Sequence, residues 1–227
     1  MFFMLGLIPD LAILRDEAVR KGNKLKAMIY APMALAWRGT NHQWVHYMRG
    51  YLIFAAIATP LVFSVHSIVS WDFAMANTPG WHTTIFPPYF VAGAIFSGLA
   101  MVITLCIPLR KIFKLEDYIT MENFEGMSKM IILTSCIVFY AYLIEFFVAW
   151  YSGNKYEYDQ FLYRATGDYA FFYWTMMFCN GIVPHALWFK KIRNNLVILF
   201  IISLLINVGM RFERFNIIVI SLSKEFE

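Results

Sequence analysis

Six ionisable side chains lie near one end of the apolar stretches of this chain, within the stretch or just beyond it: His66, Asp72, Glu145, Arg211, Glu213 and Arg214. Ionisable groups inside a bilayer are costly and usually face a cavity or a pathway. Because the six lie at similar depth, we expect a helix bundle to gather them into one site near the extracytoplasmic surface.

Proton exchange beside an aromatic slot is the chemistry that these residues favour. Histidine titrates near neutral pH, and a carboxylate in an apolar site can accept a proton. Aromatic residues make up 19% of the chain. A quinol suits this combination, since it is a flat apolar ring with a long tail and two hydroxyl protons to release. We therefore expect quinol oxidation near the outer face, with Asp72 and His66 as proton acceptors and the electrons passing to another subunit.

Each of these residues also has a simpler explanation. His66 can be a structural hydrogen-bonding residue, Asp72 can cap a turn, and Arg211 and Arg214 can anchor a helix at the membrane surface. His66 and Asp72 are six residues apart, so on a regular helix they point about 120° away from each other. They share a pocket only if the helix unwinds near Trp71 or the pocket wraps around it.

Metal and haem chemistry is not expected. The three cysteines stand singly in apolar runs: Cys106, Cys136 and Cys179. No spacing fits an iron–sulfur cluster or zinc. His66 and His185 lie at opposite depths, so they cannot ligate one haem. His42 and His46 share a helical face without a third ligand, and His82 lies in a loop without a mate. We predict that this chain binds no haem or iron–sulfur cluster.

Five apolar stretches must position these residues. They cover residues 51–71, 89–107, 128–150, 169–188 and 196–211. The first four are about long enough to cross a ~30 Å hydrocarbon core, and the last is long enough only if it runs into the cluster Arg211–Arg214. The chain is 60% hydrophobic and only 15% charged, which excludes an ordinary soluble domain. Basic residues are not clustered as in a nucleic-acid-binding protein. We predict an all-α, polytopic transmembrane helix bundle that forms one membrane domain over residues 1–227.

The basic residues predict the orientation. Most of the 19 Lys and Arg residues lie before the first span, between the second and third, or between the fourth and fifth. By the positive-inside rule these segments are cytoplasmic. Residues 15–49 then form an amphipathic cytoplasmic connection. The loop with Trp81 and His82, residues 151–168 and the tail 212–227 face outward.

The first 14 residues are apolar but interrupted by Pro9 and Asp10. They are too short to span, so we expect a partial span that belongs to a larger subunit or to a separate first half. In the second full span, residues 93 and 97 and residues 94 and 98 are small. Small residues four apart let helices approach closely, which predicts a position inside the bundle.

Several segments of the chain carry a recognisable pattern: residues 8–12 (IPDLA), 15–16 (RD), 37–39 (WRG), 58–62 (ATPLV), 64–67 (SVHS), 72–73 (DF), 79–98, 149–154 (AWYSGN) and 212–215 (FERF). They resemble the larger NrfD-like membrane subunits of bacterial alternative complex III, within the polysulfide reductase superfamily. The resemblance covers nearly the whole chain.

The resemblance implies a cofactor-free subunit that binds quinol, such as menaquinol, near the outer face of a four-helix bundle. Asp72 and Arg214 match the family's pocket best, and His66 and Arg211 lie beside them. A proton route through Glu145, Asp10 and His42 is also implied. The implied partners are an extracytoplasmic iron–sulfur subunit, a second NrfD-like membrane subunit, c-type cytochrome subunits and membrane lipid, all at the bacterial cytoplasmic membrane.

Two departures from the family and two alternative functions stay open. Family members have about ten spans and begin well before Met1, and Arg211 stands where a Trp is expected. A structural or proton-conducting subunit that never binds quinol is the main alternative. A secondary transporter is a third, but it would place its polar ligands at mid-membrane rather than near one face.

Overall fold

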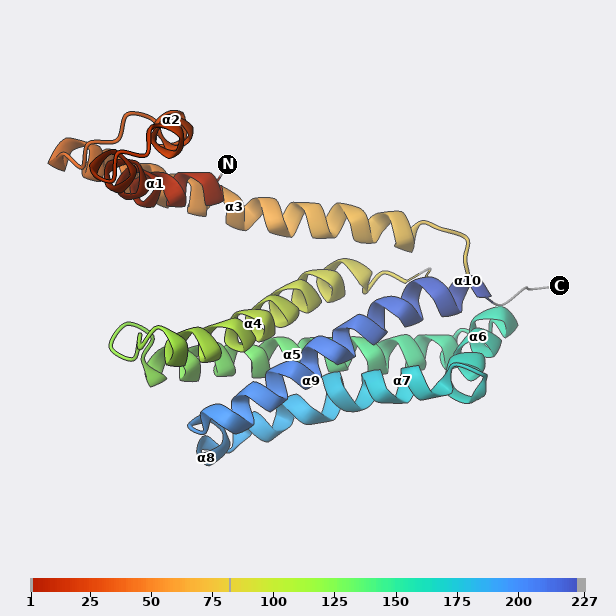
Figure 1. Cartoon of the computed structure of the whole chain (residues 1–227). Coiled ribbons are helices and arrows are strands. Elements are labelled where there is room, and N and C mark those ends of the chain that lie inside the picture. Colours follow the sequence, from red (N-terminus) through yellow and green to blue (C-terminus); the bar gives the residue numbers. More distant parts are fainter. Residues whose placement is uncertain (1, 82, 224–227) are drawn as a thin grey trace. The chain divides into compact units, whose positions relative to one another are not determined.

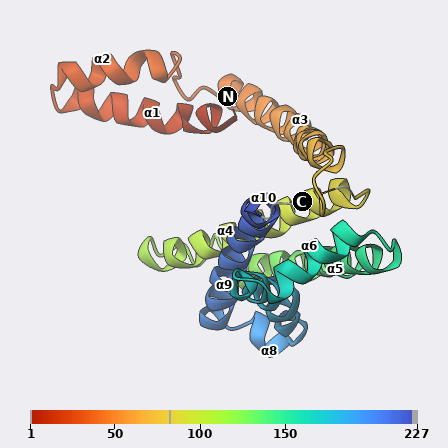
Figure 2. The same ribbon diagram turned by 90° about the vertical axis from the view of Figure 1, so that its right-hand side faces the viewer.

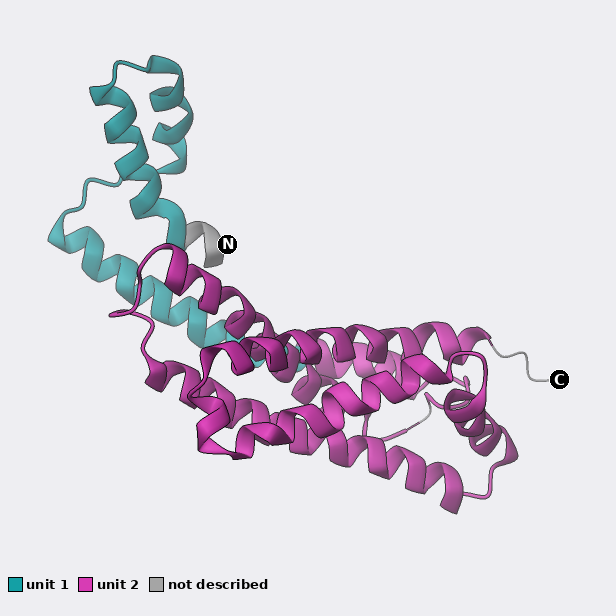
Figure 3. Cartoon of the chain, turned by 60° about the horizontal axis from the view of Figure 1, so that its bottom comes forward, with its two compact units in different colours: residues 1–64 teal, residues 65–227 magenta. Residues whose placement is uncertain are grey.

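The computed structural model describes residues 2–81 and 83–223, and within them the chain is helical without strands. It forms two compact units, residues 1–64 and 65–227 (Figure 3). The predicted all-α, polytopic helix bundle is therefore confirmed. The expectation of a single membrane domain stays a prediction.

The first unit contains α1 (Phe2–Arg20), α2 (Lys24–Met33) and most of α3 (Asn41–Ala74). A short turn joins α1 to α2, where the side chain of Asn23 caps α2 by accepting from the backbone N–H of Lys26. Arg15 donates a hydrogen bond from Nη2 to the carbonyl oxygen of Trp37 at 2.9 Å. This contact ties α1 to the loop that precedes α3.

The second unit begins with the last turns of α3 and contains the long helices (Figure 1). Its elements are α4 (Phe86–Ile112), α5 (Met121–Tyr151), α6 (Lys155–Thr166), α7 (Ala170–Met176), α8 (Lys190–Arg193), α9 (Leu196–Phe215) and α10 (Ser221–Ser223). Between them lie the π-helix η1 (Met177–Ile182), the 3-10 helix η2 (Val183–Trp188) and the π-helix η3 (Asn216–Ile220). Figure 2 shows α4, α5 and α9 from another side.

Four helices among the described residues are long and apolar enough to cross a membrane: α3, α4, α5 and the helical stretch Leu196–Ser223. They correspond to four of the five predicted spans. The fifth, residues 169–188, is helical throughout but passes from α to π to 3-10 geometry. Pro184 at the start of η2 cannot donate to a regular helical ladder, which accounts for part of this irregularity.

Two clusters of buried side chains hold the second unit together. One is mostly aliphatic and joins α4, α5 and α9 through residues such as Phe96, Ile103, Ile131, Leu199 and Ile206. The other is rich in aromatic rings and occupies the end where α5 and α9 finish; it includes Phe86, Tyr89, Phe90, Tyr142 and Tyr173. The bundle therefore carries its aromatic side chains at the end that the sequence predicts to face outward.

Candidate functional site

A buried carboxylate, Glu213, lies at the centre of the aromatic end. It is 1% exposed, because α9 repeats Ile206, Met210 and Glu213 at spacings of three and four and turns this face toward the core. The hydroxyl of Tyr142, on α5, donates a hydrogen bond to its Oε2. A buried charge or acid is stable only with such partners.

Asn180, in the π-helix η1, completes this cluster. Its Nδ2 lies 3.3 Å from Oε2 of Glu213, 3.1 Å from the hydroxyl of Tyr142 and 3.4 Å from Sδ of Met210. The helices approach very closely here, since a Cβ on Gly209 would lie 2.2 Å from Oδ1 of Asn180. That Oδ1 atom is buried and has no hydrogen-bond partner among the described residues.

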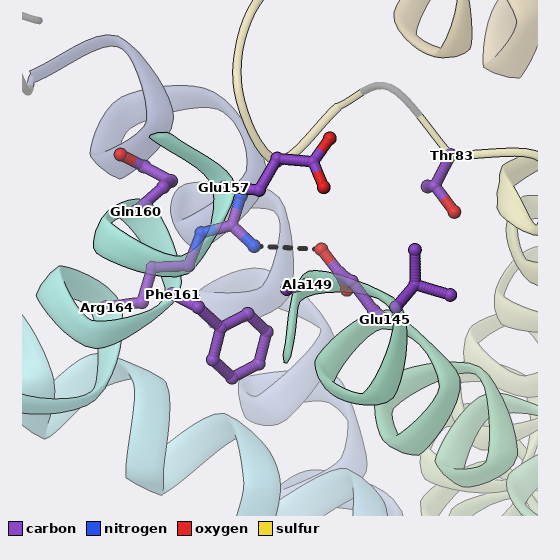
Figure 4. A pocket seen from close by; sticks show the side chains of 9 residues that line it. Thr83, Glu145, Ala149, Glu157, Gln160, Phe161 and Arg164 are labelled. Carbon is purple, nitrogen blue, oxygen red and sulfur yellow. Dashed lines mark hydrogen bonds and ion pairs between the residues drawn. The ribbon is translucent and has the colours of Figure 1, made fainter. Parts of the chain in front are cut away.

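A second polar cluster centres on Arg164 of α6, which is 5% exposed. Its Nη1 forms an ion pair with Oε1 of Glu145 at 2.9 Å (Figure 4), and its Nη2 donates to Oγ of Ser221 at 2.7 Å. Gly80 permits this arrangement, because a Cβ there would lie 2.8 Å from Nη2 and the backbone has φ +83°. Glu145, inside an apolar stretch, therefore has Arg164 as its ion-pair partner.

Two small cavities surround this ion pair. One is lined by Gly80, Thr83, Glu145 and Arg164 among others, and Figure 4 shows the side chains of Thr83, Glu145 and Arg164 around it. The second is lined by Tyr142, Glu145, Arg164, Glu213 and Asn216, so it reaches both polar clusters. Each has a volume of about 20 Å³, which accommodates about one water molecule. A water in the second cavity can link the Glu213 cluster to the Glu145–Arg164 pair.

Polar contacts continue along α9 toward the middle of the bundle. Thr104 of α4 donates to Oγ of Ser203 at 2.9 Å, and Nδ2 of Asn207 donates to Oγ1 of Thr104 at 3.1 Å. The otherwise apolar interface of α9 thus contains three polar residues: Ser203, Asn207 and Glu213. Such groups are able to exchange protons with ordered water, and they also hold α4 against α9.

Arg214 lies next to an aromatic stack that involves the end of α3. Its guanidinium carbon is 4.6 Å from the centroid of the Phe90 ring. Phe90 contacts Phe73 at 5.6 Å between centroids, and Phe73 contacts Trp81 at 4.9 Å. The Trp81 Nε1 donates to the carbonyl oxygen of Ile217 at 2.7 Å. The loop with Trp81 is therefore fastened to η3, which follows α9.

The structure brings some of the predicted site residues into this region. Asp72 precedes Phe73 and is exposed, while Arg214 is half-buried and packs on Phe90 of the same stack. His66 is half-buried, and Arg211 is exposed. Because α3 stays α-helical through Ala74, the helix does not unwind near Trp71, and His66 and Asp72 point in different directions.

Two of the remaining predicted residues, Asp10 and His42, belong to the first unit. Asp10 is exposed on α1. His42 is exposed near the start of α3, with its Nε2 3.0 Å from Nε2 of His46. His82 lies outside the described residues. No group of three or more His, Cys, Asp or Glu side chains in the described part of the chain is arranged to hold a metal ion.

Three residues of the two polar clusters are not among those predicted from the sequence: Tyr142, Asn180 and Arg164. Glu213 is among the six ionisable residues expected at this end, without an assigned role. Its spacing from Ile206 and Met210 on the apolar face of α9 was a usable signal. Arg164 had none, since it lies in a polar segment that resembles an exposed loop.

A larger cavity of about 460 Å³ lies between α5, α6 and α7 at this end of the bundle. Its walls are largely aromatic and include Phe146, Trp150, Phe161, Tyr173 and Trp174. Tyr142, which bonds Glu213, also lines it. This end therefore combines apolar room of ligand size with buried groups that exchange protons.

Comparison with known proteins agrees with this architecture. The family model described as polysulphide reductase, NrfD, matches residues 18–223. A comparison with curated proteins finds no match. Members of the NrfD family are membrane subunits of quinol-interacting oxidoreductase complexes and generally associate with iron–sulfur subunits. This chain, a multi-pass membrane protein, therefore belongs to the NrfD polysulphide reductase family.

Proposed function

We propose that this chain is the quinol-binding membrane subunit of a quinol:electron-acceptor oxidoreductase of the alternative complex III type, in a bacterial cytoplasmic membrane. The observation that carries the proposal is the meeting of buried acids and aromatic rings at one end of the bundle. There Glu213 accepts from Tyr142, and Arg214 lies over Phe90. The sequence predicts that this end faces outward.

In this proposal, quinol binds beside the stack formed by Phe73 and Phe90, near Asp72 and Arg214. Asp72 and His66 accept the protons, and Arg211 borders the mouth of the pocket. The two electrons of each quinol pass to an iron–sulfur cluster of an extracytoplasmic subunit and then to c-type cytochromes. A second NrfD-like subunit completes the membrane part.

The buried clusters supply a route for protons. The cavity shared by Tyr142, Glu145, Arg164 and Glu213 lets a single water connect two carboxyl groups. We include Glu145 in a proton path on this basis. Asp10 and His42 stay candidates from the resemblance alone.

Turnover of the assembled complex tests the proposal. Asp72→Asn and Arg214→Ala should each lower the rate of quinol oxidation without loss of assembly. Lys190→Ala is the matched control, since Lys190 is an exposed cation of α8. The proposed quinol site would be excluded by two results together: wild-type rates in both assembled site variants, and no labelling of the 65–90 region by a photoreactive quinone.

A structural or proton-conducting subunit that binds no quinol is the second candidate. Two separate sets of polar contacts favour it, because neither needs a ligand: Thr104 with Ser203 and Asn207, and Glu213 with Tyr142 and Asn180. Quinone labelling separates the two functions. If labelling is confined to another subunit while Tyr142→Phe still impairs proton transfer, the second candidate is correct.

A further inference from the structure

The opposite end of the second unit contains an apolar groove between the last turns of α4 and the first turns of α9. Ile107 and Pro108 line it from α4, and Leu196, Val197 and Phe200 line it from α9. Its volume is about 500 Å³, within the range of sites that hold small ligands. This end is the one that the sequence predicts to be cytoplasmic.

Two cations, Arg110 and Lys111, also line the groove. Neither forms an ion pair with any residue of the described ranges, 2–81 and 83–223. Nε of Arg110 is buried and has no hydrogen-bond partner there. Glu116 is the acidic residue that lines the groove, and it is paired with neither cation. The groove therefore has an excess of positive charge beside an apolar wall.

Two helix ends meet at the groove. The N-terminus of α9 adds to its positive potential, and the C-terminus of α4 accounts for part of the preference for cations there. Arg110 and Lys111 lie in the last turn of α4, where cations are favoured by the helix dipole. This does not account for an unused, buried N–H donor. The N-terminus of α9 points to the same place, with Asn195 capping Val197 and Ile198.

We propose that this groove is a binding site for an anionic phospholipid. The phosphate lies between Arg110 and Lys111 and accepts from the buried Nε of Arg110. One acyl chain follows the apolar wall from Pro108 to Phe200. A lipid satisfies both halves of the groove at once, whereas a free anion would leave the apolar half uncovered. The anionic cytoplasmic leaflet supplies such lipids.

Lipid retention by the purified, assembled complex tests the headgroup part. Native mass spectrometry would compare phosphatidylglycerol with phosphatidylcholine of the same chain length. We expect preferential retention of phosphatidylglycerol by the wild type. Affinity should fall roughly fivefold for each charge removed in Arg110→Gln and Lys111→Gln. The control is the double variant Lys190→Gln/Lys191→Gln, which removes two exposed cations of α8 that do not line the groove.

A steric variant tests the apolar part. Val197 is 68% exposed, so Val197→Trp should fold while it fills the groove and lowers retention of phosphatidylglycerol with both cations intact. Equal retention of the two lipids would overturn the proposal, as would full retention by the Arg110→Gln/Lys111→Gln variant. Equal competition by soluble glycerol phosphate would indicate a free-anion site, and a segment of a partner subunit found in the groove would also refute it.

Discussion

The hydroxyl of Tyr142 donates a hydrogen bond to the carboxylate of Glu213, which lies 71 residues further along the chain. Asn180 lies within hydrogen-bond distance of both groups. Three separate segments, α5, η1 and α9, thus contribute one side chain each to a buried polar cluster. The cluster specifies how these segments pack, and it also places a proton donor next to a proton acceptor.

We predict that Tyr142→Phe slows quinol oxidation by the assembled complex. The variant keeps the ring but removes the proton donor to Glu213, and a positioned proton-transfer group is worth about 100-fold or more in rate. Steady-state turnover is the measurement. Tyr140→Phe is the matched control, since Tyr140 is on the same helix and 57% exposed. An unchanged rate in Tyr142→Phe would exclude this hydroxyl from proton transfer.

Arg164→Gln should destabilise the second unit by about 3 kcal/mol, because it leaves the carboxylate of Glu145 without its buried partner. The double variant Glu145→Gln/Arg164→Gln should recover part of this loss. Thermal unfolding of the purified complex provides the measurement. Lys129→Gln is the control: it breaks the exposed ion pair of Lys129 with Glu125 and should cost less than about 1 kcal/mol. Equal effects of the Arg164 and Lys129 changes would contradict the prediction.

Gly209→Ala should force α9 away from η1. The added Cβ would lie 2.2 Å from Oδ1 of Asn180 and 2.7 Å from Cβ of Cys179, and such overpacking costs about 1–3 kcal/mol. Gly98→Ala is its control in α4, since nothing lies within 4 Å of a Cβ there. The melting temperature should fall for the first variant and stay the same or rise for the second. The opposite order would show that the close approach at Gly209 is not required.

Trp81→Phe should loosen the loop before α4. The ring contact with Phe73 can persist, but the hydrogen bond from Nε1 to the carbonyl oxygen of Ile217 is lost, at a cost of about 1 kcal/mol. Amide exchange in residues 75–85 should become faster. Trp174→Phe removes a comparable indole hydrogen bond, to Ala165, and should leave this loop unchanged. Equal exchange in the loop of both variants would argue against an anchoring role for Trp81.

Much of the fold was predictable because apolar stretches of membrane length leave few alternatives. The sequence places Glu145 inside an apolar stretch, where a carboxylate either takes up a proton or finds a partner. It could not identify Arg164, since α6 has polar residues on several faces and only packing beneath Gly80 buries that guanidinium. Tyr142 and Asn180 were missed for a related reason. Their role depends on contacts across 71 and 33 residues of sequence, which no local spacing records.

The position of Asn180 depends on the number of residues in the π-helix Met177–Ile182. A π turn accommodates one more residue than an α turn does. Deleting a single residue here would restore α-helical winding, and the residues beyond the deletion would keep their faces because the wide turn already absorbs the extra residue. A one-residue gap between positions 177 and 182 in a related subunit therefore indicates that this subunit lacks the wide turn that holds the Asn180 amide.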